Sequence, residues 1–248
     1  MLDMNPIKSL KIIFLTFILL YNVFNNCSAL AQNNPVIERV ADAGVINFNG
    51  KYYLAGVNTN GGFYISNNLV NWDGPVNIFS MNNEWTNGRS AGDNQIHAAD
   101  IHYWNGIFHF YWSVNYWGLR NMVVHIGHAV SDNIMGPFTE PVKDIWFDNR
   151  IDAELFIDDD STSYFYTVKF TDGNTIWGQP MSDPGHLKGE PELLFTSLPG
   201  TWERLDNNIV EGPWVFKYRS RYYMMYNANH TSNRWGNYAL GVAESDTP

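Results

Sequence analysis

Four acidic residues open four similar stretches of the sequence, and such a series could supply both a proton donor and a proton acceptor. They are Asp42, Asp100, Asp152 and Glu211, separated by 58, 52 and 59 residues. Each lies close to an apolar segment, a turn and an aromatic segment. Burying carboxylates together is costly because desolvation and repulsion both disfavour ionisation. A cluster of them therefore indicates acid–base chemistry, of which the cleavage of a glycosidic bond by two carboxyl groups is the leading example.

The segments that follow these acids have the composition of β-strands. Short aromatic and β-branched runs alternate with Gly, Asn, Asp and Pro, and helical periodicity is nearly absent after residue 31. Repeated units of about this length with antiparallel strands are typical of propeller blades, whereas a β-sandwich would give the acids no common position. We therefore expect an all-β propeller of the five-bladed type, with four blades in this chain. If the acids occupy equivalent points on the innermost strands, they converge on one mouth of the central channel.

Composition narrows the classes of partner. The chain carries a net charge of −10 and no basic run, which argues against nucleic acid as a partner. Its only cysteine is Cys27, so thiol catalysis, zinc ribbons and disulfide scaffolds are excluded. Aromatic residues make up 16% of the chain, including ten Trp, and their flat rings suit the faces of sugars as well as a β-sheet core. An oligosaccharide or polysaccharide is therefore the expected partner.

The first residues predict an export signal. Lys8 and Lys11 precede an apolar run from Ile12 to Leu20, and Ala29-Leu30-Ala31 supplies the small residues of a cleavage site. The run is too short to span a bilayer as a helix. We predict a signal peptide over residues 1–31, a propeller domain over residues 32–248, and a secreted or periplasmic location with no membrane contact after cleavage.

Three motifs, in order and at blade spacing, resemble those of glycoside hydrolase family 43, which contains five-bladed propeller arabinofuranosidases and xylosidases. The motifs are Ala41-Asp42-Ala43-Gly44-Val45-Ile46, Ile151-Asp152-Ala153-Glu154-Leu155 and Glu211-Gly212-Pro213-Trp214. Ala43 stands where proline is common in the family. The resemblance implies that Asp42 is the general base, that Glu211 is the general acid, and that Asp152 orients the acid and tunes its pKa. Such a pair cleaves with inversion of the anomeric carbon.

The second blade departs from that family. It reads Ile96-His97-Ala98-Ala99-Asp100, with a histidine in place of an expected aromatic residue, and this resembles the neoagarooligosaccharide hydrolases of family 117. On this basis His97 and Asp100 are candidate contacts to sugar hydroxyl groups. Trp117 and Trp235, which lie near blade connections, are candidate stacking platforms for the substrate, although core filling would explain them equally well.

Only four blades can be counted before Asp246-Thr247-Pro248, where family 43 normally continues into a fifth blade. We therefore expect the domain to be incomplete at its C-terminus. The histidine that often anchors a structural calcium in the family belongs to the fifth blade, so the resemblance transfers no metal site and no other cofactor to this chain.

The function expected from these features is that of an inverting, exo-acting glycoside hydrolase. It would release arabinofuranosyl, xylosyl or galactosyl units from plant or algal polysaccharides and oligosaccharides. Two alternatives stay open: a carbohydrate-binding propeller without catalysis, and an enzyme similar to the neoagarooligosaccharide hydrolases.

Overall fold

The computed structural model describes residues 36–59, 61–79, 96–115, 124–142, 146–171, 173–229 and 238–248. Arg39–Pro248 forms one compact unit. The predicted signal peptide lies outside the described residues and stays a prediction. Within the described residues, no helix has both the length and the apolar character needed to cross a membrane.

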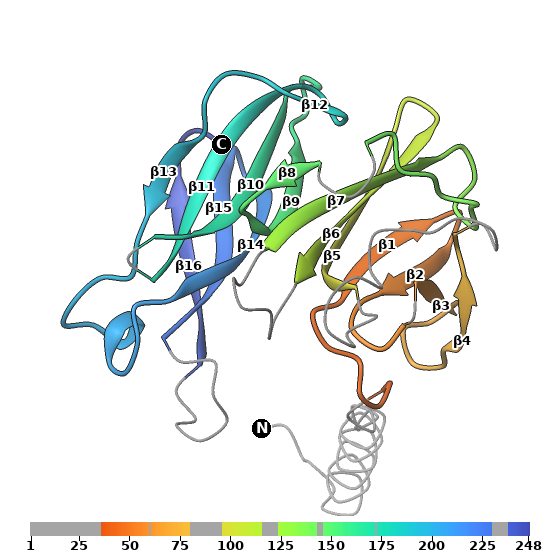
Figure 1. Cartoon of the computed structure of the whole chain (residues 1–248), viewed down its shortest axis with the longest axis horizontal. Coiled ribbons are helices and arrows are strands. Elements are labelled where there is room, and N and C mark those ends of the chain that lie inside the picture. The colour runs from red at the N-terminus through yellow and green to blue at the C-terminus, as the bar shows by residue number, and fades with distance from the viewer. Residues whose placement is uncertain are drawn as a thin grey trace, which may run out of the picture. The chain divides into compact units, whose positions relative to one another are not determined.

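The unit contains four antiparallel sheets that follow one another in sequence order, coloured from orange to blue in Figure 1. The first holds β1 (Gly44–Phe48), β2 (Lys51–Ala55), β3 (Gly62–Ser66) and β4 (Asp73–Asn77). The second holds β5 (His97–Trp104), β6 (Ile107–Asn115), β7 (Val124–Ser131) and β8 (Phe147–Asp148). The third holds β9 (Ile151–Ile157), β10 (Ser163–Phe170), β11 (Asn174–Asp183), β12 (His186–Leu187) and β13 (Glu192–Phe195). The fourth holds β14 (Val210–Tyr218), β15 (Arg221–Ala228) and β16 (Ala239–Ser245), after a short 3-10 helix at Trp202–Arg204.

The first strands of successive sheets lie next to one another. β1 contacts β5, β5 contacts β9, and β9 contacts β14. In each sheet the chain then runs outward by antiparallel pairing of sequence neighbours, with β13 added beside β11. This is the arrangement of propeller blades around inner strands. It confirms the predicted all-β propeller, with four blades in the described residues.

Tight turns between the first two strands explain part of the repeat. Asn49-Gly50 and Asn105-Gly106 join β1 to β2 and β5 to β6, with both residues of each pair at positive φ. Two-residue turns of this kind match the right-handed twist of the strands and favour Asn-Gly. Arg219-Ser220 adopts the same conformation between β14 and β15, with φ of 48° and 63°, although neither residue favours it. Strand pairing therefore imposes the turn in the fourth blade.

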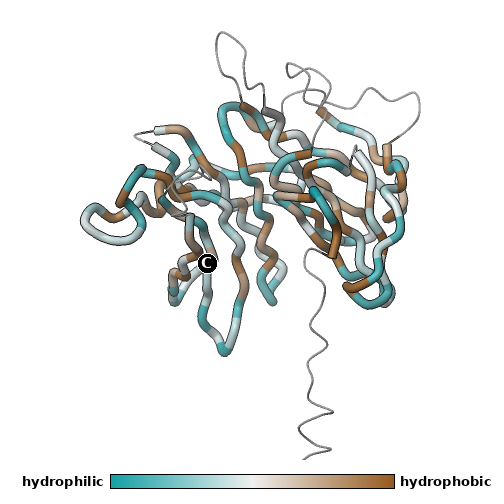
Figure 2. The backbone as a smooth tube through the Cα atoms, turned by 90° about the horizontal axis from the view of Figure 1, so that it is seen from below, coloured by the Kyte–Doolittle hydropathy of each residue, from teal (hydrophilic) through white to brown (hydrophobic). Residues whose placement is uncertain are grey.

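The apolar core lies in layers between successive blades. Phe63 of the first blade packs against Phe110 of the second, and Phe110 stacks on Trp112 of the same blade. Other layers join the second blade to the third and the third to the fourth, the latter around Tyr166 and Tyr226. Along the chain, hydrophobic stretches alternate with hydrophilic ones, and several peripheral turns are hydrophilic (Figure 2). Because successive blades bury apolar side chains against one another, these layers hold the inner strands, and the acids near their starts, in register.

Candidate active site

Every inner strand begins with the same β-bulge. The two bulged residues and the single residue opposite them are Ala98-Ala99 and Trp112, Asp152-Ala153 and Thr167, and Gly212-Pro213 and Tyr226. Before β1, Asp42-Ala43 lies opposite Gly56, because Val57 N donates to Ala41 O (2.9 Å) and Gly44 pairs with Ala55. The first residue of each bulge is left-handed, with φ of 51° at Asp42, 45° at Ala98, 54° at Asp152 and 63° at Gly212. For a residue other than glycine this costs roughly 1–2 kcal/mol, and such strain is typical of functional sites.

This bulge corrects the expectation that the four acids occupy equivalent points. Asp42 and Asp152 are equivalent, since each is the left-handed residue of its bulge. Glu211 lies one residue before that position in its blade, and Asp100 lies two residues after it. The acids therefore leave the backbone at three different levels. If the four acids occupied equivalent positions, their carboxyl groups would have similar environments. At these positions the environments differ.

Asp152 is mostly buried and tied to both neighbouring blades. Its backbone N–H donates to Ser113 Oγ (2.9 Å), and its Oδ2 accepts a hydrogen bond from Gly212 N (2.9 Å). Burial and then the charge of Glu211 raise the pKa of Asp152 to about 8, against the opposing effect of the Gly212 hydrogen bond. At neutral pH this carboxyl group therefore retains a proton.

Glu211 is held at both carboxyl oxygens. Tyr238 Oη donates to Oε1 (2.8 Å), and Asn174 Nδ2 donates to Oε2 (2.5 Å). Burial is the largest influence and raises the pKa of Glu211, the two hydrogen bonds oppose the shift, and the charge of Asp42 adds to it. Because Asp152 and Glu211 repel each other, their protons titrate as those of a pair. This pair can keep a proton available for donation at neutral pH.

Asp42 has a different environment. Its side chain is 51% exposed, and its Oδ2 lies 3.5 Å from His97 Nδ1. A water molecule can therefore reach the Asp42 carboxylate. Asp152 is less accessible to water because it is mostly buried. The site thus combines one open carboxylate with a buried pair that retains a proton.

These groups line one cavity of about 1130 Å³. Its wall includes Asp42, His97, Asp100, Asp152 and Glu211, so the structure brings together every predicted site residue that it describes. The cavity is large enough for a small ligand or a few sugar rings. Trp117 and Trp235 lie outside the described residues, and their stacking role stays a prediction. The described aromatic residues on the wall are Phe170, Trp214 and Tyr238.

Asp100 also has structural partners. Its Oδ2 accepts from Leu155 N of the next inner strand (2.7 Å), and its Oδ1 lies 2.9 Å from His102 Nε2. Glu154 is the equivalent residue in the third blade, and its Oε1 accepts from Val215 N in the same way (3.0 Å). These carboxyl groups therefore join successive inner strands. Contacts of His97 or Asp100 with a sugar stay predictions.

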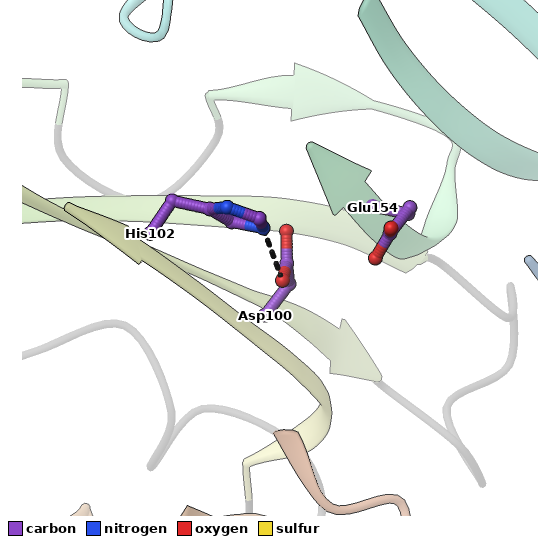
Figure 3. A group of neighbouring side chains, drawn as sticks. All are labelled: Asp100, His102 and Glu154. Carbon is purple, nitrogen blue, oxygen red and sulfur yellow. Dashed lines mark hydrogen bonds and ion pairs between the residues drawn. The ribbon is translucent and has the colours of Figure 1, made fainter. Parts of the chain in front are cut away.

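Asp100, His102 and Glu154 are also the described group that comes nearest to a metal site. Figure 3 shows His102 paired with Asp100 and Glu154 beside them, and one donor atom of each lies within 4.8 Å of the others. Calcium takes six to eight oxygen ligands, whereas this group offers three donors, one of them a nitrogen. Both oxygens of Asp100 already have partners. The group therefore does not fit a calcium ion.

Several residues of the site have no motif that reveals them. Asn174 and Tyr238 lie 37 and 27 residues from Glu211, which they hold, and Ser113 lies 39 residues from Asp152. Gly173, before Asn174, is a residue type that favours a turn, but it carries no sign of a contact with the next blade. Glu154 lies within the motif around Asp152, but its sequence context does not distinguish a link between strands from a catalytic group.

Comparison with known proteins places this geometry in a family. The model of glycosyl hydrolases family 43 matches residues 32–248. An endo-1,4-beta-xylanase from Bacteroides thetaiotaomicron is 32% identical with a TM-score of 0.70, over 84% of this chain and 69% of that one. A thermostable family-43 glycoside hydrolase is 31% identical with a TM-score of 0.72, over 87% and 72%. The xylosidase/arabinosidase 43A of Humicola insolens is 28% identical over 147 residues, 44% of each chain.

The chain spans less than half the length of the curated relatives it matches. The family model nevertheless covers the whole predicted propeller domain, and the two solved structures share its fold at more than 30% identity. The three motifs around Asp42, Asp152 and Glu211 lie within that match. The chain therefore belongs to glycosyl hydrolases family 43.

Proposed function

We propose that this chain hydrolyses O-glycosidic bonds in polysaccharides that contain arabinose or xylose, by a single displacement that inverts the anomeric carbon. The observation that carries the proposal is the pairing of one open carboxylate, Asp42, with the proton-retaining pair of Asp152 and Glu211 in one cavity. Membership of family 43 and the names of the relatives, which include a xylosidase/arabinosidase and an alpha-L-arabinofuranosidase, support the substrate class.

The chemistry follows from the three environments. Asp42 takes a proton from a water molecule, whose oxygen bonds to the anomeric carbon as the glycosidic C–O bond breaks. Glu211 gives its proton to the departing oxygen. The buried Asp152 keeps the pKa of the pair high, so that a proton remains at the site at neutral pH.

Kinetics of two variants test this assignment. Glu211→Gln should lose nearly all activity on natural glycosides but keep much of it on 2,4-dinitrophenyl glycosides, whose leaving group needs little protonation. Asp42→Asn should lose activity on both, because the water is no longer activated. Full activity of Glu211→Gln on a natural substrate would show that the assignment is wrong.

The finer proposal is exo action that releases arabinofuranosyl, xylosyl or galactosyl units. The names of two curated relatives support it, whereas a probable arabinan endo-1,5-alpha-L-arabinosidase and the endo-xylanase favour internal cleavage. The early products from arabinan, xylan and galactan distinguish exo from endo cleavage. Exo action releases monosaccharide from the first minutes, whereas endo action releases oligosaccharides first. Binding of these polysaccharides without any product would favour the non-catalytic propeller instead.

We also propose export through a signal peptide over residues 1–31, which rests on the basic and apolar pattern of that segment. Expression in a secreting host followed by mass spectrometry should give a mature chain that begins at Gln32. An intact N-terminus on exported protein would contradict the proposal.

A further inference from the structure

Glu211 receives its two hydrogen bonds from different blades. Asn174 is the first residue of β11 in the third blade, and Tyr238 directly precedes β16 in the fourth. One partner holds Oε2 and the other holds Oε1, so the carboxyl plane is fixed from both sides. These two contacts limit the rotation of the Glu211 carboxyl group. A carboxyl group can donate a proton without such contacts, so they need a separate explanation.

Asn174 is held firmly. It is 9% exposed and forms a backbone bridge to Ile209, two residues before Glu211. Gly173 before it has φ +91°, and a Cβ there would lie 2.0 Å from Asn208 O. The tip of the β10–β11 hairpin therefore presses against the segment that leads into β14. This close approach fixes the distance between the Asn174 amide and Glu211.

Tyr238 is less enclosed. The residue is 43% exposed and lines the cavity. Burial and then the charge of Glu211 raise the pKa of its hydroxyl group, which therefore keeps its proton. A hydroxyl group can rotate about its C–O bond, and it can either donate or accept a hydrogen bond.

The two partners differ in what they can accept. The N–H of an amide can only donate, so a proton on Oε2 would face the Asn174 N–H without an acceptor. A proton on Oε1 can be accepted by the Tyr238 oxygen once that hydroxyl group turns. We propose that Asn174 and Tyr238 are positioning residues that place the acidic proton of Glu211 on Oε1, with Tyr238 turning from donor to acceptor when Glu211 is protonated. This inference rests on the proposed hydrolase function.

The step balances without another reactant. The proton on Oε1 leaves its hydrogen bond with the Tyr238 oxygen and moves to the glycosidic oxygen, which also keeps the electron pair of the breaking C–O bond. Tyr238 then turns its O–H back toward the Oε1 carboxylate, while Asn174 donates to Oε2 throughout. The titratable groups around Glu211 are Asp42 before β1, Asp152 on β9 and Tyr238, with His97 of β5 beside Asp42. Burial and the charge of Asp42 favour protonation of Glu211, whereas the two hydrogen bonds favour the ionised form and so make Glu211 a stronger acid.

The variant Tyr238→Phe tests the proposal. Hydrogen bonds to an ionised group are stronger than those to a neutral one, so their loss weakens the acid. The basic limb of the kcat/KM profile should move up by about one pH unit. Activity on a natural glycoside should fall about tenfold, while activity on a 2,4-dinitrophenyl glycoside should change by less than about twofold. Asn174→Ala should move the limb in the same direction.

Tyr218→Phe is the matched control, because Tyr218 is an exposed tyrosine at the far end of β14 and does not line the cavity. It should leave the pH profile unchanged. A ¹³C NMR titration of the Glu211 carboxyl group in Tyr238→Phe gives a readout that needs no turnover, and the same upward shift is expected.

Two results would overturn the inference while leaving the proposed function intact. One is an active Tyr238→Phe whose basic limb and NMR titration match those of the wild type. The other is an equal loss of activity on both substrates with no shift in pH, which would indicate a merely structural contact. A wild-type chain that hydrolyses neither substrate would reject the proposed function, and this inference with it.

Discussion

Replacing Asp152 by asparagine should stabilise the protein at alkaline pH. The folded-state pKa of Asp152 is raised to about 8, so between pH 4 and 8 the folded chain holds a proton that the unfolded chain has released. Proton binding and folding are linked. Because the folded state binds more protons than the unfolded state in this range, the free energy of unfolding falls as pH rises. The wild type therefore loses stability from about pH 4 upward, and the loss is complete above about pH 8. An asparagine cannot ionise and should remove this loss.

The pKa shift of Asp152 sets an upper bound on the stability that Asp152→Asn can gain at alkaline pH. A shift of about four units corresponds to roughly 5–6 kcal/mol at 1.36 kcal/mol per unit. Asp152 is mostly rather than completely buried, and it shares the proton with Glu211, so we expect about half of that, ~3 kcal/mol, at pH 9. For a domain of this size, 3 kcal/mol corresponds to a rise in Tm of roughly 6–12 °C. Below pH 4 the two proteins should be nearly equal.

Urea unfolding at pH 4, 6 and 9 measures the difference, with the substitution Asp73→Asn on the exposed strand β4 as control. The control should follow the wild type at every pH. If Asp152→Asn is no more stable than the wild type at pH 9, or if its advantage does not grow with pH, the proposed protonation of the buried carboxyl is wrong.

Two further predictions concern the frame around the site. Gly44→Ala should destabilise the fold by about 3 kcal/mol or more, because a Cβ would lie 2.0 Å from Ala99 O where β1 meets β5. Gly189→Ala is its control: it has open space but a φ of +71°, so it should lose only about 1–2 kcal/mol from backbone strain. Equal urea midpoints for the two variants would refute the steric argument. Replacing Arg219-Ser220 by Asn-Gly should stabilise the fourth blade by about 1 kcal/mol, because both positions have positive φ. A lower urea midpoint in that double variant would count against the turn assignment.

The blades could be predicted from the sequence because their signals are local. Alternating aromatic and β-branched residues mark the strands, and pairs such as Asn49-Gly50 and Asn105-Gly106 select the turns between them. The convergence of Asp42, Asp152 and Glu211 on one cavity could also be anticipated, since a repeat places the starts of all the inner strands near the same mouth.

The bulge could not be predicted in the same way. It inserts a residue into each inner strand, and its left-handed position is occupied by Asp42, Ala98, Asp152 and Gly212, of which only glycine signals positive φ. Asp100 and Glu211 therefore lie at levels that their positions in the sequence repeat do not reveal. Asn174 and Tyr238 were missed because their contacts with Glu211 depend on how two blades pack, which residue spacing does not encode.

In the proposed mechanism, Asp42 activates a water molecule on the face of the sugar opposite the bond that Glu211 protonates. Proton NMR of the first sugar released, recorded faster than mutarotation, tests it most directly. We expect the first anomer to have the configuration opposite to that of the substrate. A first anomer of the same configuration would contradict it, because a covalent intermediate would then replace the attack by water.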